Sequence, residues 1–307
     1  MNDLTTEIKK LEIETLDNLK LSKAKNTIRA YKSDFSDFAL FCSKHGMKSM
    51  PTEPKIVSLY LTYLSKNSKF STLKRRLASI NVMHKYKGHY LDTKHPIIVE
   101  NLLGIKRQIG IYQKAKKPLL FNDLKTIINV INKSTLSEFK KLRDKSVILV
   151  GFSGGFRRSE LVNLNYEDID FVQEGLKILI KRSKTDQSGE GNIKAIPYFD
   201  NQEYCPVVTL KNYINQKFSN INEGKIFDIS DKSVALIIKR YAKKAGLDAS
   251  KYAGHSLRSG FATTAAEFGA EERNIMAMTG HKTTQMVRRY IQEANLFKNN
   301  ALNKIKI

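Results

Sequence analysis

A short basic segment with one proline, residues 113–118 (QKAKKP), interrupts the helical patterning of this chain. Charge and proline together disfavour a helix and are typical of a linker between domains. The chain has 307 residues, whereas a single hydrophobic core stops growing at about 250 to 300 residues. The segment therefore predicts two folded parts, one before it and one after it, each long enough to bury its own core.

The part before this linker has the pattern of four short helices. Apolar residues recur at helical spacing over 26–46, 52–64, 71–88 and 96–109. Thr52 is expected to cap the second helix with its hydroxyl, and Pro54 fits the first turn. We therefore expect a small helical bundle over 22–112.

Basic side chains fall on the expected outer faces of the third and fourth helices. They are Lys74, Arg75, Arg76, Lys106 and Arg107. The opposite, inner faces are expected to consist of Leu73, Leu77, Ile80 and Met83 in the third helix, and of Val99, Leu102 and Leu103 in the fourth. A solvated surface would explain any one of these cations, but their repetition on successive helices favours a bundle that contacts DNA.

The charge of the whole chain points to the same partner. Fifty-three Lys and Arg against thirty Asp and Glu leave a net charge of +23, spread along the sequence. Such an excess is typical of a protein that binds nucleic acid. There is no apolar run of the roughly 18 residues that a membrane span needs, and no signal-peptide pattern. We expect a soluble cytoplasmic protein associated with DNA and not with a membrane. Cys42 and Cys205 are expected to be buried free thiols.

The part after the linker mixes helices with one β-hairpin. Helical patterns begin at Asn122 and Ser137, and two further helices are expected at about 206–217 and 233–245. Residues 176–180 and 193–198 alternate and are rich in β-branched side chains, which predicts two strands joined by a long tip. The expected fold class is mainly α with a small β-hairpin or sheet (α+β).

Tyr290, near the end of the chain, is a candidate nucleophile. A tyrosine hydroxyl titrates near pH 10 and reacts poorly unless positive charge surrounds the group that it attacks. His281 follows a helix end at Gly280, and this break lets His281 and Tyr290 converge, which nine residues of continuous helix would not allow. His255 and Arg258, at i and i+3, share a helix face.

Two more cations from earlier in the chain complete this set. Arg157 and Glu160 share a face after the glycine turn at 154–155, and Lys184 stands where the first hairpin strand enters the tip. Two guanidinium groups can hold the non-bridging oxygens of a phosphodiester and stabilise the charge of its transition state. Attack on a phosphodiester by Tyr290 is the chemistry that this set favours, without a metal or another cofactor.

The motifs 155–161 (GFRRSEL), Lys184, 255–258 (HSLR), 280–281 (GH) and Tyr290 occur in an order and spacing that resemble the tyrosine recombinases, the phage-integrase type of site-specific DNA recombinase. The resemblance implies a helical, SAM-like core-binding domain over 22–112, a linker at 113–118 and a catalytic domain over 119–295. The two domains would together form a C-shaped clamp on DNA. An acidic amphipathic extension, 1–21, and a tail, 296–307, lie outside these domains.

The resemblance also implies a role for each candidate site residue. Arg157 and Arg258 would bind the scissile phosphate, and Tyr290 would attack it to leave a 3′-phosphotyrosine and a free 5′-hydroxyl. Lys184 would act as general acid for the leaving oxygen. The remaining roles are proton transfer for His255, a hydrogen bond to phosphate for His281, and ordering of the site for Glu160.

Several alternatives remain open at this point. Arg158 adjoins Arg157, and Lys181 or Lys194 could replace Lys184 as the general acid. Lys181 fits the body of the first strand better, and Lys194 fits the return strand near DNA. An acidic run at 167–170 could hold a metal in a nuclease, although it fits a loop after the Arg157 helix better. A type IB topoisomerase uses the same chemistry, and a catalytically silent DNA-binding architectural factor has the same charge.

The expected partner is double-stranded DNA with paired recombination sites. The tail carries an apolar stripe, formed by Leu296, Phe297, Ala301, Leu302 and Ile305, with little of the chain left to cover it. In the family such tails dock into a neighbouring subunit, so the resemblance implies a homotetramer on synapsed DNA.

Overall fold

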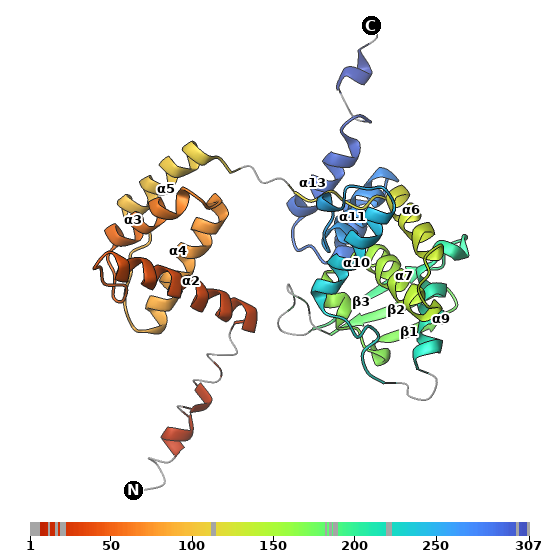
Figure 1. Ribbon diagram of the computed structural model, residues 1–307, viewed down its shortest axis with the longest axis horizontal. Coiled ribbons are helices and arrows are strands. Elements are labelled where there is room, and N and C mark those ends of the chain that lie inside the picture. Colours follow the sequence, from red (N-terminus) through yellow and green to blue (C-terminus); the bar gives the residue numbers. More distant parts are fainter. Residues whose placement is uncertain are drawn as a thin grey trace. The chain divides into compact units, whose positions relative to one another are not determined.

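The computed structural model describes residues 7–11, 13–15, 18, 23–111, 115–181, 183, 186, 190–218, 223–298 and 301–305. The chain forms two compact units, Met1–Lys114 and Ala115–Ile307 (Figure 1). Their boundary falls within the basic segment 113–118. Of the helix predicted within 1–21, residues 7–11 and 13–15 are helical and exposed, and the others lie mainly outside the described residues.

The N-terminal unit is a bundle of four helices. They are α2 (Lys25–Lys44), α3 (Pro54–Ser65), α4 (Phe70–Tyr86) and α5 (Pro96–Ile109). Helix α2 packs along α4, and α3 packs along α5. Their buried core includes Phe38, Tyr60, Leu61, Leu73, Ile80 and Ile98. All four predicted helices are therefore present, with bounds within a few residues of those expected.

Thr52 is not the N-cap of α3, contrary to the prediction. Glu53 occupies that position and no side chain caps the helix. Thr52 is buried instead, and its backbone N–H donates to Nε2 of His84, 3.1 Å away. Pro54 at the first helical position lacks an N–H, which leaves one donor fewer for a cap to satisfy.

The inner face predicted for α5 is right only for Leu102, which packs against the core. The helix buries Ile98 and Ile105, and it leaves Val99 38% and Leu103 41% exposed. Apolar residues run around much of α5, so helical spacing alone allows more than one face, and packing against α3 selects the one that is buried.

Two of the basic residues expected on the outer face of α4 belong to an ion-pair network. The buried carboxylate of Asp34 accepts hydrogen bonds from Arg75 and from the Ser79 hydroxyl, and lies 3.3 Å from Arg76. The Arg76 side chain is only 18% exposed and also contacts Asp37 at 3.3 Å. Arg76 is therefore turned inward, whereas Lys74, Lys106 and Arg107 are exposed as predicted.

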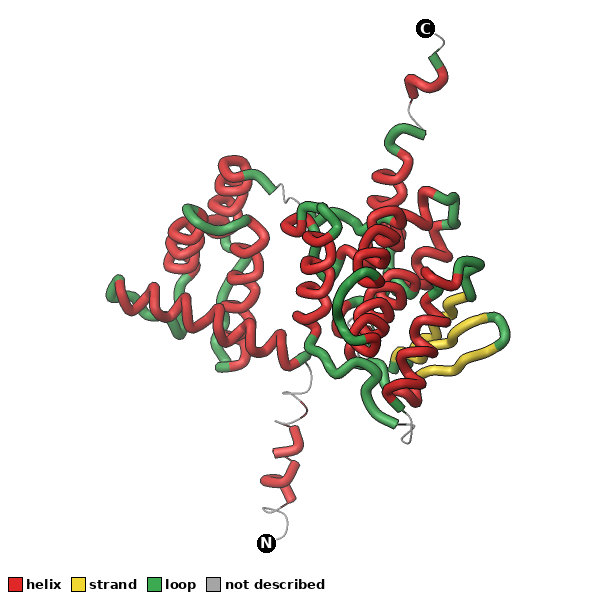
Figure 2. The backbone as a smooth tube through the Cα atoms, turned by 45° about the vertical axis from the view of Figure 1, so that its right-hand side comes forward, coloured by secondary structure: helices red, strands yellow, loops and turns green. Residues whose placement is uncertain are grey.

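The C-terminal unit is a layer of helices against a small sheet (Figure 2). Its helices are α6 (Phe121–Asn132), α7 (Glu138–Ser153), α8 (Arg158–Val162), α9 (Pro206–Lys217), α10 (Asp231–Lys244), α11 (Ser256–Glu267), α12 (Glu272–Thr279) and α13 (Thr284–Asn295). Helix α7 is central, because its last seven residues, 147–153, are all buried and it packs against α9 and α11. A helix that is apolar all round lies inside a core.

The sheet has three antiparallel strands in the order β1 (Ile169–Val172), β2 (Gly175–Ile180) and β3 (Asn192–Pro197). The sequence predicts β2 and β3 but not β1, since the acidic run at 167–170 fits a loop. That run instead forms a short 3₁₀ turn, Tyr166–Asp168, that leads directly into β1. The alternation in β1 is incomplete, because the apolar residues Phe171 and Val172 are adjacent.

Other predictions about the whole chain can be compared with the described residues. Cys42 and Cys205 are buried free thiols, as predicted. No helix within the described ranges has both the length and the apolar character of a membrane span. The carboxylate of Asp168 pairs with Lys181 at 2.6 Å and accepts a hydrogen bond from the backbone of Asn165. The acidic run thus has structural partners.

Candidate active site

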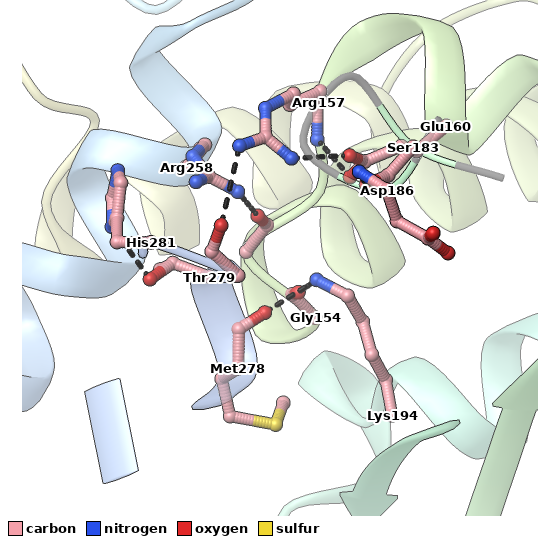
Figure 3. Close-up of polar contacts among 12 residues, drawn as sticks. Gly154, Arg157, Glu160, Ser183, Asp186, Lys194, Arg258, Met278, Thr279 and His281 are labelled. Carbon is pink, nitrogen blue, oxygen red and sulfur yellow. Dashed lines mark hydrogen bonds and ion pairs between the residues drawn. The ribbon is translucent and has the colours of Figure 1, made fainter. Parts of the chain in front are cut away.

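Arg157 is positioned by the glycine turn between α7 and α8. Gly155 has φ of +54°, in the left-handed region, and a Cβ there would come within 3.1 Å of Phe261 and Thr279. Arg157 follows as the N-cap of α8, where Glu160 accepts hydrogen bonds from its backbone N–H at 2.9 Å and its guanidinium at 2.6 Å. The same guanidinium donates to the carbonyl of Gly280 at 3.4 Å (Figure 3).

Arg158 does not point into the same site as Arg157. Its guanidinium lies 3.7 Å from Asp231, and its side chain covers Gly254, where a Cβ would clash at 1.9 Å from Arg158 Cδ. Of the two neighbouring arginines, Arg157 is the one that lines the cavity described below.

Arg258 lies on α11 and is 1% exposed. Its Nη1 donates to the carbonyl of Gly155 at 2.9 Å, which fixes the guanidinium beside the turn that carries Arg157. Burial, and then the neighbouring charge of Arg157, lowers the pKa of Arg258 to about 10. It remains a cation at neutral pH. Two guanidiniums so close together favour an anion between them.

His281 follows the left-handed Gly280 (φ 61°, ψ 42°) that ends α12, as the sequence predicts. Thr279 Oγ1 lies 2.6 Å from the carbonyl of Ile275 and 2.7 Å from His281 Nδ1. The single hydroxyl proton is needed for the carbonyl, so Nδ1–H of His281 donates to Thr279 and Nε2 faces away. Burial and the charges of Arg258 and Arg157 lower the pKa of His281 to about 4, so the ring is neutral before an anion binds.

Tyr290 projects from α13 beside His255. Its hydroxyl lies 3.4 Å from Nε2 of His255, and its ring centroid lies 6.1 Å from that of His281. His255 lies at the surface of the unit, yet desolvation by the surrounding protein, followed by Arg258, Arg157 and Arg158, lowers its pKa, so its imidazole is neutral at pH 7 and can accept a proton. Burial raises the pKa of Tyr290, although Arg258 and Arg289 oppose this. The hydroxyl is protonated until a base takes its proton.

The three hairpin lysines have different surroundings. Lys184 lies outside the described residues. Lys181 pairs with Asp168 and belongs to the end of the strand, as the sequence analysis favours. Lys194, expected to lie near DNA, is 3% exposed, and its Nζ donates to the carbonyls of Gly154 and Met278 (Figure 3).

Two contacts in this site are missed by the sequence analysis. The hydrogen bond from His281 to Thr279 spans only two residues, and the threonine before Gly280 is its one signal in the sequence. The burial of Lys194 has a clearer signal, because it alternates in phase with the buried Ile196 along β3.

Arg157, Glu160, Lys194 and His281 line a cavity of about 260 Å³ together with described residues of the hairpin tip, whereas Arg258, His255 and Tyr290 are not among its lining residues. Among the described residues, no cluster of three His, Cys, Asp or Glu side chains could bind a metal. The site instead combines the buried guanidinium of Arg258, the partly buried guanidinium of Arg157, two neutral imidazoles and a tyrosine hydroxyl. This arrangement can bind a phosphate and deprotonate a nucleophile next to it.

Comparison with known proteins places the chain in a family. The family model described as the phage integrase family matches residues 117–296. An integrase/recombinase xerD homolog of Selenomonas ruminantium is 39% identical over 311 residues, which cover 96% of this chain and 90% of that protein.

Solved structures are similar to the chain as well. The XerH site-specific recombinase, solved bound to a palindromic difH substrate, has a TM-score of 0.66 at 18% identity, and the match covers 89% of this chain and 80% of the XerH chain. A lambda integrase dimer bound to a core site has a TM-score of 0.57 at 16% identity, covering 96% and 98%. Because the family model spans more than half of the sequence, the chain belongs to the phage integrase family of tyrosine recombinases.

Proposed function

We propose that Tyr290 is the nucleophile with which this enzyme, a site-specific recombinase, breaks and rejoins DNA. The observation that carries the proposal is the distance of 3.4 Å between the Tyr290 hydroxyl and Nε2 of a neutral His255. A half-buried tyrosine with a raised pKa needs a base for its proton, and His255 is within reach of it.

In the proposed step, the Tyr290 oxygen attacks the phosphorus of a phosphodiester while its proton passes to His255 Nε2. The bond between phosphorus and the 5′ oxygen breaks, which leaves a 3′-phosphotyrosine and a 5′-hydroxyl whose proton comes from Lys184. Attack by a 5′-hydroxyl of another strand reverses these transfers and joins the new ends. The energy of the phosphodiester bond is kept in the protein–DNA linkage, so the step needs no ATP.

Arg157 and Arg258 would hold the two non-bridging oxygens of the scissile phosphate. Their charge would offset the negative charge that grows on those oxygens in the transition state. Glu160 would keep Arg157 in place through its contact of 2.6 Å. His281 would donate from Nε2 once the bound anion raises its pKa and the ring takes up a proton.

The proposed partner is double-stranded DNA that carries paired recombination sites. XerH is solved bound to a palindromic difH substrate, and lambda integrase as a dimer bound to a core site. For this chain we propose a tetramer, with phosphate contacts from the exposed Lys74, Lys106 and Arg107 of the N-terminal unit. A clamp on one duplex, as the resemblance implies, needs contacts from both units.

The C-terminal tail is the proposed link between subunits. Leu296, Phe297, Leu302 and Ile305 are 62%, 86%, 63% and 57% exposed. A chain that ends after Asn295 should bind a single half-site with a Kd within about threefold of the full chain, because it keeps α13. It should form few tetramers on DNA with two sites, which native gels or light scattering can measure. Unchanged tetramer formation would refute this role of the tail.

A nicked suicide substrate tests the proposed function. The short fragment between the nick and the cleavage site diffuses away after cleavage, so the covalent intermediate accumulates. We expect a protein–DNA adduct that survives denaturation. A DNA-binding architectural factor forms no such adduct. A topoisomerase forms it but only relaxes a two-site plasmid, whereas a recombinase exchanges strands between the sites.

A further inference from the structure

Lys194 is a buried cation for which the proposed mechanism has no use. It lies on β3 opposite Ile178 of β2, and its side chain enters the core beside the site. Nζ donates to the carbonyl of Gly154 at 2.6 Å and to that of Met278, and it lies 4.5 Å from the centroid of the Phe156 ring. Two carbonyls and one aromatic face thus surround the ammonium group.

The two carbonyls belong to the C-terminal ends of different helices. Gly154 is the C-cap of α7, and Met278 lies in the last turn of α12. Carbonyls at helix ends have no partner within their own helix, and the helix dipole gives these ends a partial negative charge. One ammonium ion therefore satisfies both ends, and their charge offsets part of the cost of burying it.

Each of these helix ends leads into the candidate site. Arg157 follows Gly154 by three residues, and His281 follows Met278 by three residues. The hydrogen bond from Arg157 to the carbonyl of Gly280 joins the same two segments closer to the cavity. Lys194 contacts the base of both segments and also lines the cavity.

We propose that Lys194 is a positioning residue for DNA cleavage, whose ammonium group holds the Arg157 turn against the helix end that presents His281. The inference rests on the proposed function of the site and adds a residue to it. It also gives Lys194 a role different from that of a general acid. Two of the three ammonium protons donate to the helix-end carbonyls, and the ring of Phe156 lies beside Nζ.

The charges around Lys194 make its protonation sensitive to the phosphate. Arg157 and Glu160 face it from the turn and α8, Arg258 from α11, and His281 from the segment after α12. Glu190 borders the same cavity from the hairpin. Burial, with Arg258 and Arg157 and against Glu160, lowers the pKa of Lys194 to about 7. A phosphate between the two arginines would offset their charge and favour the ammonium form.

The test compares Lys194→Met with Lys177→Met, which removes an exposed lysine from the neighbouring strand. Cleavage of the suicide substrate is measured at saturating DNA, with Kd from gel shifts and the melting temperature of each variant. We expect Lys194→Met to cleave about 100-fold more slowly with Kd within about threefold, since a displacement of about 1 Å at a site can have this effect. Lys177→Met should cleave like the wild type.

The variant Lys194→Arg adds a readout that loss of stability would not change. Its guanidinium can donate to both carbonyls, so it should cleave at least tenfold faster than Lys194→Met. The ratio of its rate to the wild-type rate should rise as the pH passes the pKa of Lys194 in the DNA complex, because arginine stays protonated there and Lys194 does not. Lys194→Arg remains measurable if Lys194→Met fails to fold, and a Lys194→Arg variant that folds and binds DNA but cleaves about 100-fold more slowly than the wild type would overturn the proposal.

A substrate with sulfur in place of the leaving 5′ oxygen separates positioning from acid catalysis. A thiolate leaves without receiving a proton, so the loss of a general acid is rescued and the loss of a positioning residue is not. We expect rescue of Lys184→Ala and none of Lys194→Met. Rescue of Lys194→Met, or its wild-type rate on the ordinary substrate, would refute the inference. If Tyr290→Phe formed the adduct, the proposed function itself would fail, whatever Lys194 does.

Discussion

Arg258→Ala is expected to slow the formation of the protein–DNA adduct by about a thousandfold, the loss typical of removing a donor that stabilises transition-state charge. The guanidinium is 1% exposed and is fixed by the Gly155 carbonyl. It therefore acts from a site with little water, where its charge is weakly screened. Affinity for DNA should fall much less, because many phosphate contacts along the duplex support binding. Single-turnover cleavage and gel shifts measure the two effects separately.

Two further variants control for folding and for charge. Arg258→Lys keeps a cation but loses the planar fork, so it should also cleave far more slowly than the wild type. Arg273→Ala removes an exposed arginine of α12 that pairs with Glu271, so it should cleave within about threefold of the wild type. Equal losses in Arg273→Ala and Arg258→Ala would contradict the assignment of the site.

Tyr290→Phe is expected to abolish the adduct while DNA binding is retained. The substitution removes only the hydroxyl oxygen, and the phenylalanine ring can keep the packing of Tyr290 against the α11–α13 cluster that includes Val287 and Ile291. Without that oxygen no phosphotyrosine can form, so the loss should be complete. Tyr252→Phe is a matched control, because Tyr252 is buried and donates to Asp123 at 2.8 Å on another part of the unit. It should form the adduct.

Much of the fold follows from local pattern. The helices of both units appear as apolar stripes bounded by Gly or Pro, and β2 and β3 as alternating runs, because each signal lies within a few residues. Gly280 shows why the candidate site is also partly predictable. A glycine after a helix predicts a left-handed end, and that end brings His281 towards Tyr290.

The predictions that fail depend on contacts between distant segments. Helical spacing predicts that Arg76 is exposed. Its guanidinium instead donates to Asp34, 42 residues earlier in the chain, and the side chain is turned inward. Packing against α3 determines which face of α5 is buried. The backbone N–H of Thr52 donates to His84, and Thr52 does not cap α3. The bridging role of Lys194 depends on residues 40 and 84 positions away in the chain. A pattern of neighbouring residues carries no information about contacts between residues so far apart in the chain.

The identity of the residue joined to DNA is the most direct test of the account. The adduct from the nicked substrate would be digested with nuclease and trypsin, and the peptide that carries nucleotides sequenced by mass spectrometry. We predict that the peptide 290–298 (YIQEANLFK) carries them on Tyr290. Nucleotides attached to any other residue, or an adduct that forms equally in Tyr290→Phe, would contradict the proposed mechanism.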